Sequence, residues 1–309
     1  MTQYLKVIKI RWQTPAVLLV VASFFLLAAI SLAGADAGID AGIDRGHGLL
    51  WEVSKAGAEP AYLFGTIHSE DPDVLQLAKP VQQAFAASQA VVLEMLLDVD
   101  AMRYSSAAML MMDGRSLSDI TGQPLFKQAS QAMQSRGIPA TVLDRMQPWA
   151  AAVTLSMPAP ETGQVLDAML YQNALQQGKD VYGLETVQEQ LHVFESMSEA
   201  DQIVLLKDAV ENFSDIDAMH AELLAAYKQR DLNGLVAISE ASMQQGDQRL
   251  ADEFQQRLVV DRNHRMAERM RQYLQQGKAF IAVGALHLPG EEGLLNLLEQ
   301  QGYTVRRMY

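Results

Sequence analysis

The stretch Tyr62-Leu-Phe-Gly-Thr-Ile-His68 decides the fold of this sequence, because here an apolar run ends abruptly at an ionisable residue. Three more short apolar runs end in the same way, before Glu94, Glu185 and His287. Runs that are apolar throughout are typical of strands buried on both faces. We therefore expect an α/β fold, in which helices cover a sheet.

Strands and helices are unevenly distributed along the chain. The expected strands lie at Leu49–Val53, Ala61–Ile67, Ala90–Glu94, Asp180–Glu185, Ala279–Gly284 and Tyr303–Met308. A helix is expected over Val74–Ala87, capped by Asp71 or Asp73. Residues 101–178 and 186–276 are almost entirely helical in pattern, so a large helical section is inserted between the strands.

The first 35 residues differ from the rest. A basic start precedes an uncharged run from Ala16 to Leu32, and Ala33-Gly34-Ala35 has the pattern that signal peptidase reads. The run fits either a cleaved signal peptide or an N-terminal membrane anchor over residues 16–33. Both alternatives predict an exported protein of the periplasm or cell envelope, because the basic flank stays inside. Residues 36–48, rich in Gly and Asp, are expected to be a flexible tether, and residues 49–309 the folded domain.

Composition excludes several classes of function. The formal net charge of −13 argues against nucleic-acid binding, which needs clustered Lys and Arg. The chain has no cysteine, so any metal ligands must be His, Asp or Glu. It has no Gly-x-Ser-x-Gly elbow, no phosphate-binding loop and no His-Glu-x-x-His helix.

The ionisable residues at the strand ends form the candidate site. In covered α/β sheets, ligands bind beyond the carboxyl ends of the strands. His68, His287 and Glu94 there match the two-imidazole, one-carboxylate set that binds divalent metals. Each histidine also follows a glycine by three residues, in the pattern Gly-x-x-His. The structural alternative is that each histidine caps a strand and that Glu94 and Glu185 begin helices.

A long helix expected near residues 248–275 adds a second indication. Its apolar face contains Arg262, with Asn263 at the edge and His264 on the opposite, polar face. A core arginine needs a carboxylate or an anionic ligand as partner, or else extends to the surface at the core margin. His192 and His220 lie in charged helical stretches, and we expect both at the surface.

Together these residues resemble a known family. Leu50-Trp-Glu-Val, Gly65-Thr-Ile-His68, Val92-Leu-Glu94, Gly178-Lys-Asp-Val-Tyr-Gly-Leu-Glu-Thr186 and Gly284-Ala-Leu-His-Leu-Pro-Gly290 are similar to motifs of the TraB/GumN family, which includes the Tiki metalloproteases. The resemblance implies an erythromycin esterase/Tiki/ChaN-like fold with a central mixed β-sheet flanked by helices. It also implies a divalent-metal peptidase that uses His68, His287, Glu94 and Arg262.

The function that we predict is metal-assisted hydrolysis of a peptide in the cell envelope. His68, His287 and Glu94 would bind Mn²⁺, Co²⁺ or Zn²⁺. Glu185 would act as general base, Arg262 would stabilise the oxyanion, and Asn263 would contact the substrate. Two alternatives stay open: a non-catalytic module that binds or sequesters a peptide, haem or metal, and an esterase for a small molecule.

Overall fold

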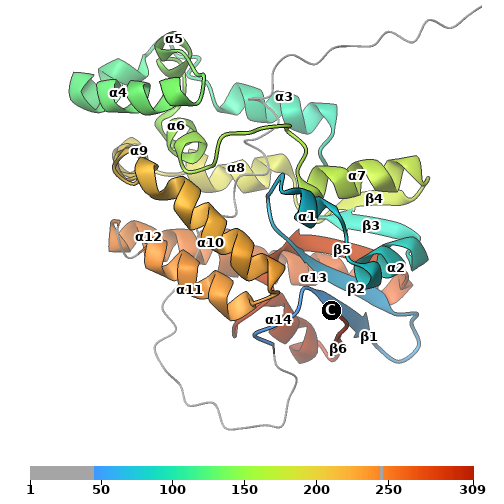
Figure 1. Ribbon diagram of the computed structural model, residues 1–309. Coiled ribbons are helices and arrows are strands. Elements are labelled where there is room, and N and C mark those ends of the chain that lie inside the picture. The colour runs from blue at the N-terminus through green and yellow to red at the C-terminus, as the bar shows by residue number, and fades with distance from the viewer. Residues whose placement is uncertain (1–44, 244–245) are drawn as a thin grey trace, which may run out of the picture.

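The computed structural model describes residues 45–243 and 246–309, which include one six-stranded sheet (Figure 1). The strands are β1 (Leu50–Ser54), β2 (Ala61–Thr66), β3 (Ala90–Leu93), β4 (Asp180–Gly183), β5 (Ala279–Gly284) and β6 (Thr304–Arg307). Each of the six expected strands is confirmed, with ends that differ by at most two residues.

The sheet is mixed. Its order is β4-β3-β5-β2-β1-β6, and β4, β3, β5 and β2 run parallel to one another. The hairpin partner β1 runs antiparallel to β2, and β6 runs antiparallel to β1. The predicted fold class, a central mixed sheet flanked by helices, is therefore confirmed. All six residues of β5 are buried, as expected for a strand at the centre of a covered sheet.

Helices make up most of the remaining described chain. They are α1 (Pro72–Leu75), α2 (Lys79–Ala87), α3 (Val99–Ala108), α4 (Leu117–Ser135), α5 (Ala140–Leu143), α6 (Pro148–Leu155), α7 (Leu166–Gln176), α8 (Val187–Glu195), α9 (Glu199–Glu211), α10 (Ile216–Lys228), α11 (Leu232–Met243), α12 (Gln248–Gln255), α13 (Asp261–Gln276) and α14 (Leu294–Gln300). Short 3₁₀ turns lie at Phe213–Asp215 and Ala285–His287.

The expected helix over Val74–Ala87 is wrong in its extent. Asp71 caps α1 by accepting hydrogen bonds from the N–H groups of Asp73 and Val74, but α1 ends within one turn. Pro80 has no N–H and its ring would clash with the preceding turn, so a helix cannot continue through it. A second helix, α2, begins there instead, with Pro80 in its first turn.

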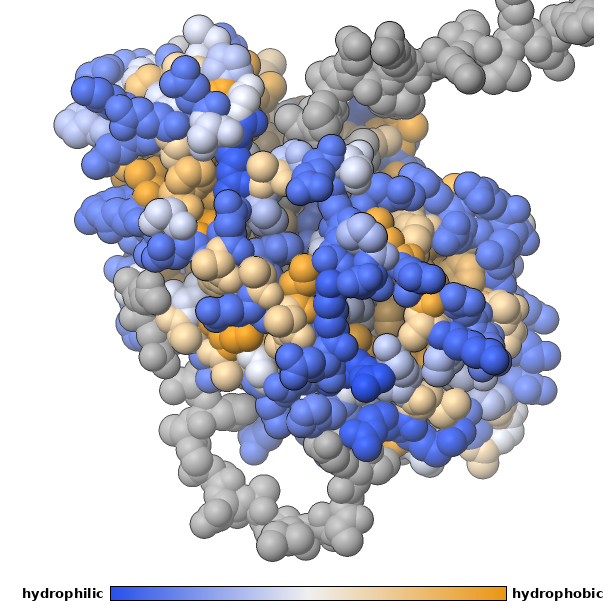
Figure 2. Space-filling view, viewed as in Figure 1, coloured by the Kyte–Doolittle hydropathy of each residue, from blue (hydrophilic) through white to orange (hydrophobic). Residues whose placement is uncertain are grey.

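The helices form two groups, each with its own apolar core. One core packs around the sheet, and the other lies among helices of the inserted section. Figure 1 shows α4, α5, α6, α9 and α12 gathered away from the strands, and α7 beside β3 and β4. The face shown in Figure 2 is mostly hydrophilic, with hydrophobic residues visible between the hydrophilic ones.

The long helix expected near residues 248–275 is present, but it contains an irregular turn. A π-helical turn over Gln256–Val260 joins α12 to α13. Turns of this kind carry an extra residue and are frequent at functional sites. Arg262 follows this turn and lies in the interior, as its place on the apolar face predicted.

The N-terminal predictions fall largely outside the described residues. The signal peptide or anchor over residues 1–35 and residues 36–44 of the tether are among them. Of the tether, residues 45–48 are described and contact the folded domain: the N–H of Gly48 donates to the carbonyl of Arg230, and His47 bridges to Asp231. Within residues 45–243 and 246–309, no helix has both the length and the apolar content needed to cross a membrane.

Gly65 allows β2 to approach the segment after β5 closely. A Cβ atom built on Gly65 would lie 2.8 Å from Cδ1 of Leu288 and 3.1 Å from Cα of Ala285. The first glycine of the Gly-x-x-His pattern is therefore needed for close packing, and its φ angle is not in the left-handed region. This contact fixes the distance between the two segments that carry His68 and His287.

We predict that Gly65→Ala destabilises the protein by about 1–3 kcal/mol, because the new methyl group overpacks a rigid contact. Urea denaturation measures this change in the free energy of unfolding. In a Leu288→Ala background the additional cost of Gly65→Ala should be smaller, since Cδ1 is removed. Equal costs in the two backgrounds would contradict this account.

Candidate functional site

The carboxyl ends of the parallel strands bring the predicted residues to one edge of the sheet. Thr66 of β2 pairs with Gly284 of β5, and Leu93 of β3 pairs with Ala282 of β5 and with Gly183 of β4. The residues that follow these strand ends are all buried: His68, Glu94, Glu185 and His287. All four strand ends thus carry buried ionisable residues at one edge of the sheet, and that they share one metal-binding pocket stays a prediction.

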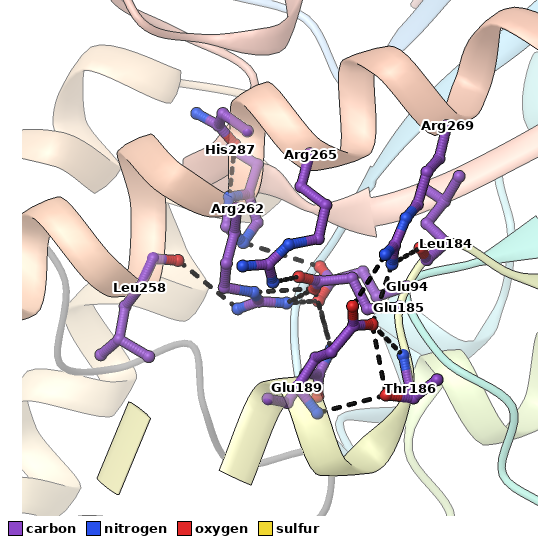
Figure 3. A network of polar contacts seen from close by, with 12 residues as sticks. Glu94, Leu184, Glu185, Thr186, Glu189, Leu258, Arg262, Arg265, Arg269 and His287 are labelled. Atoms are coloured by element: carbon purple, nitrogen blue, oxygen red, sulfur yellow. Dashed lines mark hydrogen bonds and ion pairs between the residues drawn. The ribbon is translucent and has the colours of Figure 1, made fainter. Parts of the chain in front are cut away.

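Arg262 of α13 joins the two glutamates at this edge (Figure 3). Its Nε donates to Oε2 of Glu185 at 2.8 Å, and its Nη2 donates to Oε2 of Glu94 at 2.5 Å. Arg265, one turn further along, donates to Oε1 of Glu185 at 2.7 Å. Arg262 is only 1% exposed, so its charge is neutralised inside the protein and does not extend to the surface.

Glu94 lies at the centre of this network. Its Oε1 accepts the N–H of Gly284 at 2.7 Å, and Gln190 lies 3.4 Å from Oε2. Burial raises the pKa of Glu94 to about 7, although Arg262 and the N–H of Gly284 oppose the rise. Burial also acts to lower the pKa of Arg262, but Glu185 and Glu94 more than compensate, so that pKa is raised. The network thus fixes both glutamates between two strands and α13.

A second ion pair fixes the helix that follows Glu185. Both oxygens of Glu189 accept from Arg269, at 2.7 and 2.8 Å, and the Arg269 guanidinium also donates to the carbonyl of Leu184 (Figure 3). Thr186 and Glu189 form a reciprocal capping box at the start of α8. Arg269 of α13 therefore binds the chain both before Glu185, at Leu184, and after it, at Glu189 of α8.

His287 is oriented by the residue next to Arg262. Its Nδ1 lies 2.7 Å from Oδ1 of Asn263, whose Nδ2 donates to the carbonyl of Glu292 at 2.7 Å. An amide oxygen only accepts, so Nδ1 of His287 carries the proton and Nε2 faces Oε1 of Glu94 at 3.8 Å. Burial and the Arg262 charge hold the pKa of His287 well below 6.5, so the ring is neutral. Asn263, predicted to contact substrate, is fully buried here and holds this ring.

His68 lies in the wall of a cavity of about 270 Å³. It is 4% exposed, and neither ring nitrogen has a hydrogen-bond partner. Burial, with a smaller effect of His220, lowers the pKa of His68 to about 4, so this ring is also neutral. The cavity is lined by His68, Ser69, Glu70, Asp71, Pro72, Met157, Pro158, Ala159, Pro160, Glu161, Val165, His220 and Leu224.

The expectation that His220 lies at the surface is wrong. The ring lines the same cavity as His68, and its Nε2 is buried without a hydrogen-bond partner. The charged neighbours Asp217 and Glu222 face outward, but α10 turns His220 inward because Leu223 and Tyr227 on its buried face pack beside it. His192 and His264 are exposed, as expected.

Asp167 is a site residue that the sequence does not indicate. Its Oδ1 accepts the Thr66 hydroxyl at 2.9 Å, and its Oδ2 is buried without a partner. Burial raises the pKa of Asp167 to about 6. The only sequence signal is an acidic residue in the first turn of α7, which is common at helix starts and so carries little information.

One wall of the cavity is fastened by Glu70, two residues after His68. The Glu70 carboxylate accepts the backbone N–H groups of Glu161, Thr162 and Gly163 and the hydroxyl of Thr162. The segment from Met157 to Val165, which includes Pro158 and Pro160, is held over the cavity in this way. Glu70 and its partners therefore shape the space in front of His68.

The side chains at this edge of the sheet are of the types that bind divalent metal ions. His68 and His287 are neutral imidazoles, as metal ligands must be, and Asp167 offers an unpaired carboxylate oxygen. Oε1 of Glu94 lies 3.8 Å from Nε2 of His287, and the two oxygens of Glu94 already accept from Gly284 and Arg262. In the part of the chain that the structure describes, no three His, Asp or Glu side chains are grouped closely enough to hold an ion.

We predict that Arg262→Met lowers the free energy of unfolding by about 3–5 kcal/mol at pH 7, because buried Glu94 loses its guanidinium partner and Glu185 keeps only Arg265. Arg269→Met is the matched control, since its ion pair is half exposed and should contribute about 1 kcal/mol or less. Thermal and urea denaturation of both variants measure the difference. Equal losses would show that the Arg262 network does not act as a buried ion pair.

Asp167 predicts a pH dependence of stability. Since its pKa is raised in the folded protein, from 3.8 to about 6, the folded state binds the proton more tightly than the unfolded state. The contribution of Asp167 is therefore favourable at low pH and is lost as the pH rises from about 4 to about 6. We expect Asp167→Asn to become more stable relative to the unmodified protein across this interval. A constant difference in urea midpoint between pH 4 and pH 7 would contradict the assignment.

Comparison with known proteins gives this site a family context. Metalloprotease TIKI2 of Danio rerio is 24% identical over 310 residues, which cover 83% of this chain and 60% of the relative. Metalloprotease TIKI2 of Xenopus tropicalis is 25% identical, over 83% of this chain and 59% of the relative. The metalloprotease TIKI homolog of Nematostella vectensis is 24% identical, over 83% of this chain and 66% of the relative. The chain thus spans about three fifths of the length of the first two.

No solved structure matches the chain. Residues 49–307, which include every strand and helix described above, match the model of the TraB/PrgY/gumN family. This match covers far more than half of the chain and contains both Gly-x-x-His segments, Glu94, Glu185 and Arg262. The protein therefore belongs to the TraB/PrgY/gumN family.

Proposed function

We propose that this protein is a metal-dependent hydrolase of the cell envelope, and that its substrate is a peptide. The observation that carries the proposal is His68: an imidazole that is 4% exposed, with both nitrogens unpaired, in the wall of a cavity. Buried polar groups in native proteins are nearly always paired, so an unpaired one suggests an unseen ligand. The relatives named metalloproteases support a metal as that ligand.

In this proposal His68, His287 and Glu94 hold the ion. Bound there, Mn²⁺, Co²⁺ or Zn²⁺ would supply Lewis acidity for amide hydrolysis. Asn263 would keep Nδ1 of His287 protonated and so direct its Nε2 inward. Oε1 of Glu94 accepts the N–H of Gly284 and would bind the ion with its second lone pair.

The chain offers several groups for proton transfer and charge stabilisation. Glu185 as general base and Arg262 as oxyanion stabiliser stay our proposed catalytic residues, although the two are paired with each other. Hydrolysis through them requires the pair to open towards the substrate. Asp167, whose Oδ2 has no partner, is a second carboxylate that could accept a proton at this edge.

The segment Met157–Val165, fastened by Glu70, would form the wall against which the substrate lies. Its proline residues limit backbone motion, and its apolar side chains exclude water. Export to the cell envelope, argued from residues 1–35, is part of the same proposal.

The hydrogen bonds that Glu94 and Glu185 already accept favour a second function, that of a non-catalytic binding module. Each oxygen of Glu94 and Glu185 already accepts at least one donor, and the ion pairs of both carboxylates with Arg262 disfavour proton uptake. A protein that binds and retains a peptide, haem or metal needs the cavity but no base. Turnover separates this function from the hydrolase.

We predict that the full-length protein cleaves members of a random peptide library, measured by mass spectrometry, and that EDTA abolishes cleavage. Mn²⁺, Co²⁺ or Zn²⁺ added after EDTA should restore it. His68→Ala and His287→Ala should each lower the rate at least about 100-fold, because the lost activation of water is the largest single catalytic contribution. His192→Ala, an exposed histidine, is the control and should be unaffected.

Outcomes of this experiment decide between the two functions. Metal uptake in calorimetry without any cleavage supports the binding module. Cleavage that survives EDTA and both histidine substitutions overturns the proposed metal site. Cleavage of p-nitrophenyl esters but not of peptides supports the esterase.

A further inference from the structure

Helix α10 is fastened to the segment that carries His68. The Tyr227 hydroxyl donates to the carbonyl of Gly65 at 2.8 Å, inside the first Gly-x-x-His motif. One residue further, Nζ of Lys228 donates to Oδ2 of Asp71 and of Asp73, both at 2.9 Å. These three contacts, one buried and two exposed, hold α10 at a fixed position beside the end of β2. They also fix the position of His220, which lies two turns earlier on α10.

His220 and His68 face the same space. Both line the cavity of about 270 Å³, and both line a smaller apolar cavity beside it, with Thr66, Ile67 and Leu223. The His220 ring lies against the backbone of His68. Its Nε2 is buried without a hydrogen-bond partner, like both nitrogens of His68. Three unpaired imidazole nitrogens thus lie on two neighbouring side chains.

His287 has different surroundings. Its Nδ1 is bound to Asn263 and its Nε2 faces Glu94. Among the described residues, those that line the two cavities beside His68 do not include His287. The imidazole that the fold places beside His68 is therefore His220, from a helix outside the family motifs quoted above.

A pair of imidazoles with no protein partner suits a particular class of ligand. Water could bond one nitrogen, but buried nitrogens in neutral rings are preferred ligands for Zn²⁺ and similar transition metals. Mn²⁺ and Mg²⁺ prefer carboxylate and carbonyl oxygens. The nearby carboxylate of Glu70 is occupied by Thr162 and its neighbours, and that of Asp71 by Lys228. Among the described residues that line the two cavities, the buried polar atoms without a partner are the nitrogens of His68 and Nε2 of His220.

We infer that His220 is a further ligand of the ion that His68 binds, and that the two imidazoles favour Zn²⁺ or Co²⁺ over Mn²⁺. The inference rests on the proposed metal-dependent function and adds to it a ligand and a metal preference. Two histidine ligands leave the other coordination positions open to water and to substrate atoms in the cavity.

Titration calorimetry of the full-length protein with Zn²⁺, Co²⁺ and Mn²⁺ alone tests this inference. We expect His220→Ala to weaken Zn²⁺ and Co²⁺ binding by roughly 10–100-fold. The same variant should weaken Mn²⁺ binding less. The visible absorption of bound Co²⁺ should also change, since a nitrogen ligand is lost. His220→Gln keeps most of the side-chain volume, so it controls for a loss of metal binding that is caused by unfolding. Thermal denaturation measures the stability of both variants. His192→Ala, on the exposed face of α8, is the matched control.

The outcomes separate this inference from the proposed ligand set. Weakened binding in His68→Ala and His220→Ala supports the inference, and unchanged binding in His287→Ala would then remove His287 from the ligand set. Unchanged Zn²⁺ affinity and Co²⁺ spectrum in both His220 variants, with binding lost in His68→Ala and His287→Ala, overturns the inference and leaves the proposed function intact. Unchanged binding in every variant overturns both.

Discussion

The ion pair between Arg262 and the glutamates at the strand ends is the constraint on which the rest of this structure depends. A guanidinium buried to 1% exposure is tolerable only if carboxylates surround it, and Glu94 and Glu185 come from two neighbouring parallel strands. Helix α13 must therefore lie across the carboxyl ends of β3 and β4. That position in turn brings Asn263, the next residue, to His287. One electrostatic requirement thus orients a helix, two strand ends and an imidazole.

The network and the cavity divide the site into two parts with different properties. Around Arg262 every carboxylate oxygen accepts a donor, so this part is rigid and fully paired. Around His68, polar atoms of His68, His220 and Asp167 are buried without partners. Native proteins rarely leave such atoms unpaired. A rigid, paired support beside unpaired functional groups is the arrangement expected of a site that is preorganised for a ligand.

The inserted helical section supplies what the sheet cannot. Helix α7 carries Asp167, and α10 carries His220 and the tyrosine that binds Gly65. The preceding segment, Met157–Val165, closes the cavity through Glu70. Helices α7 and α10 pack in the apolar core around the sheet, whereas α4, α6 and α9 contribute to the second core.

The sequence by itself determined the α/β fold, the six strands, the buried arginine and the four ionisable strand ends, because apolar runs, helical periodicity and abrupt polar endings are local patterns. It did not indicate Asp167 or the break before Pro80, and it misplaced His220 at the surface. Only the tertiary structure decided which groups share a cavity. Asp167 meets Thr66 across 101 residues, and Tyr227 meets Gly65 across 162. Such contacts depend on how helices pack against a sheet, and no pattern along a single chain records that packing.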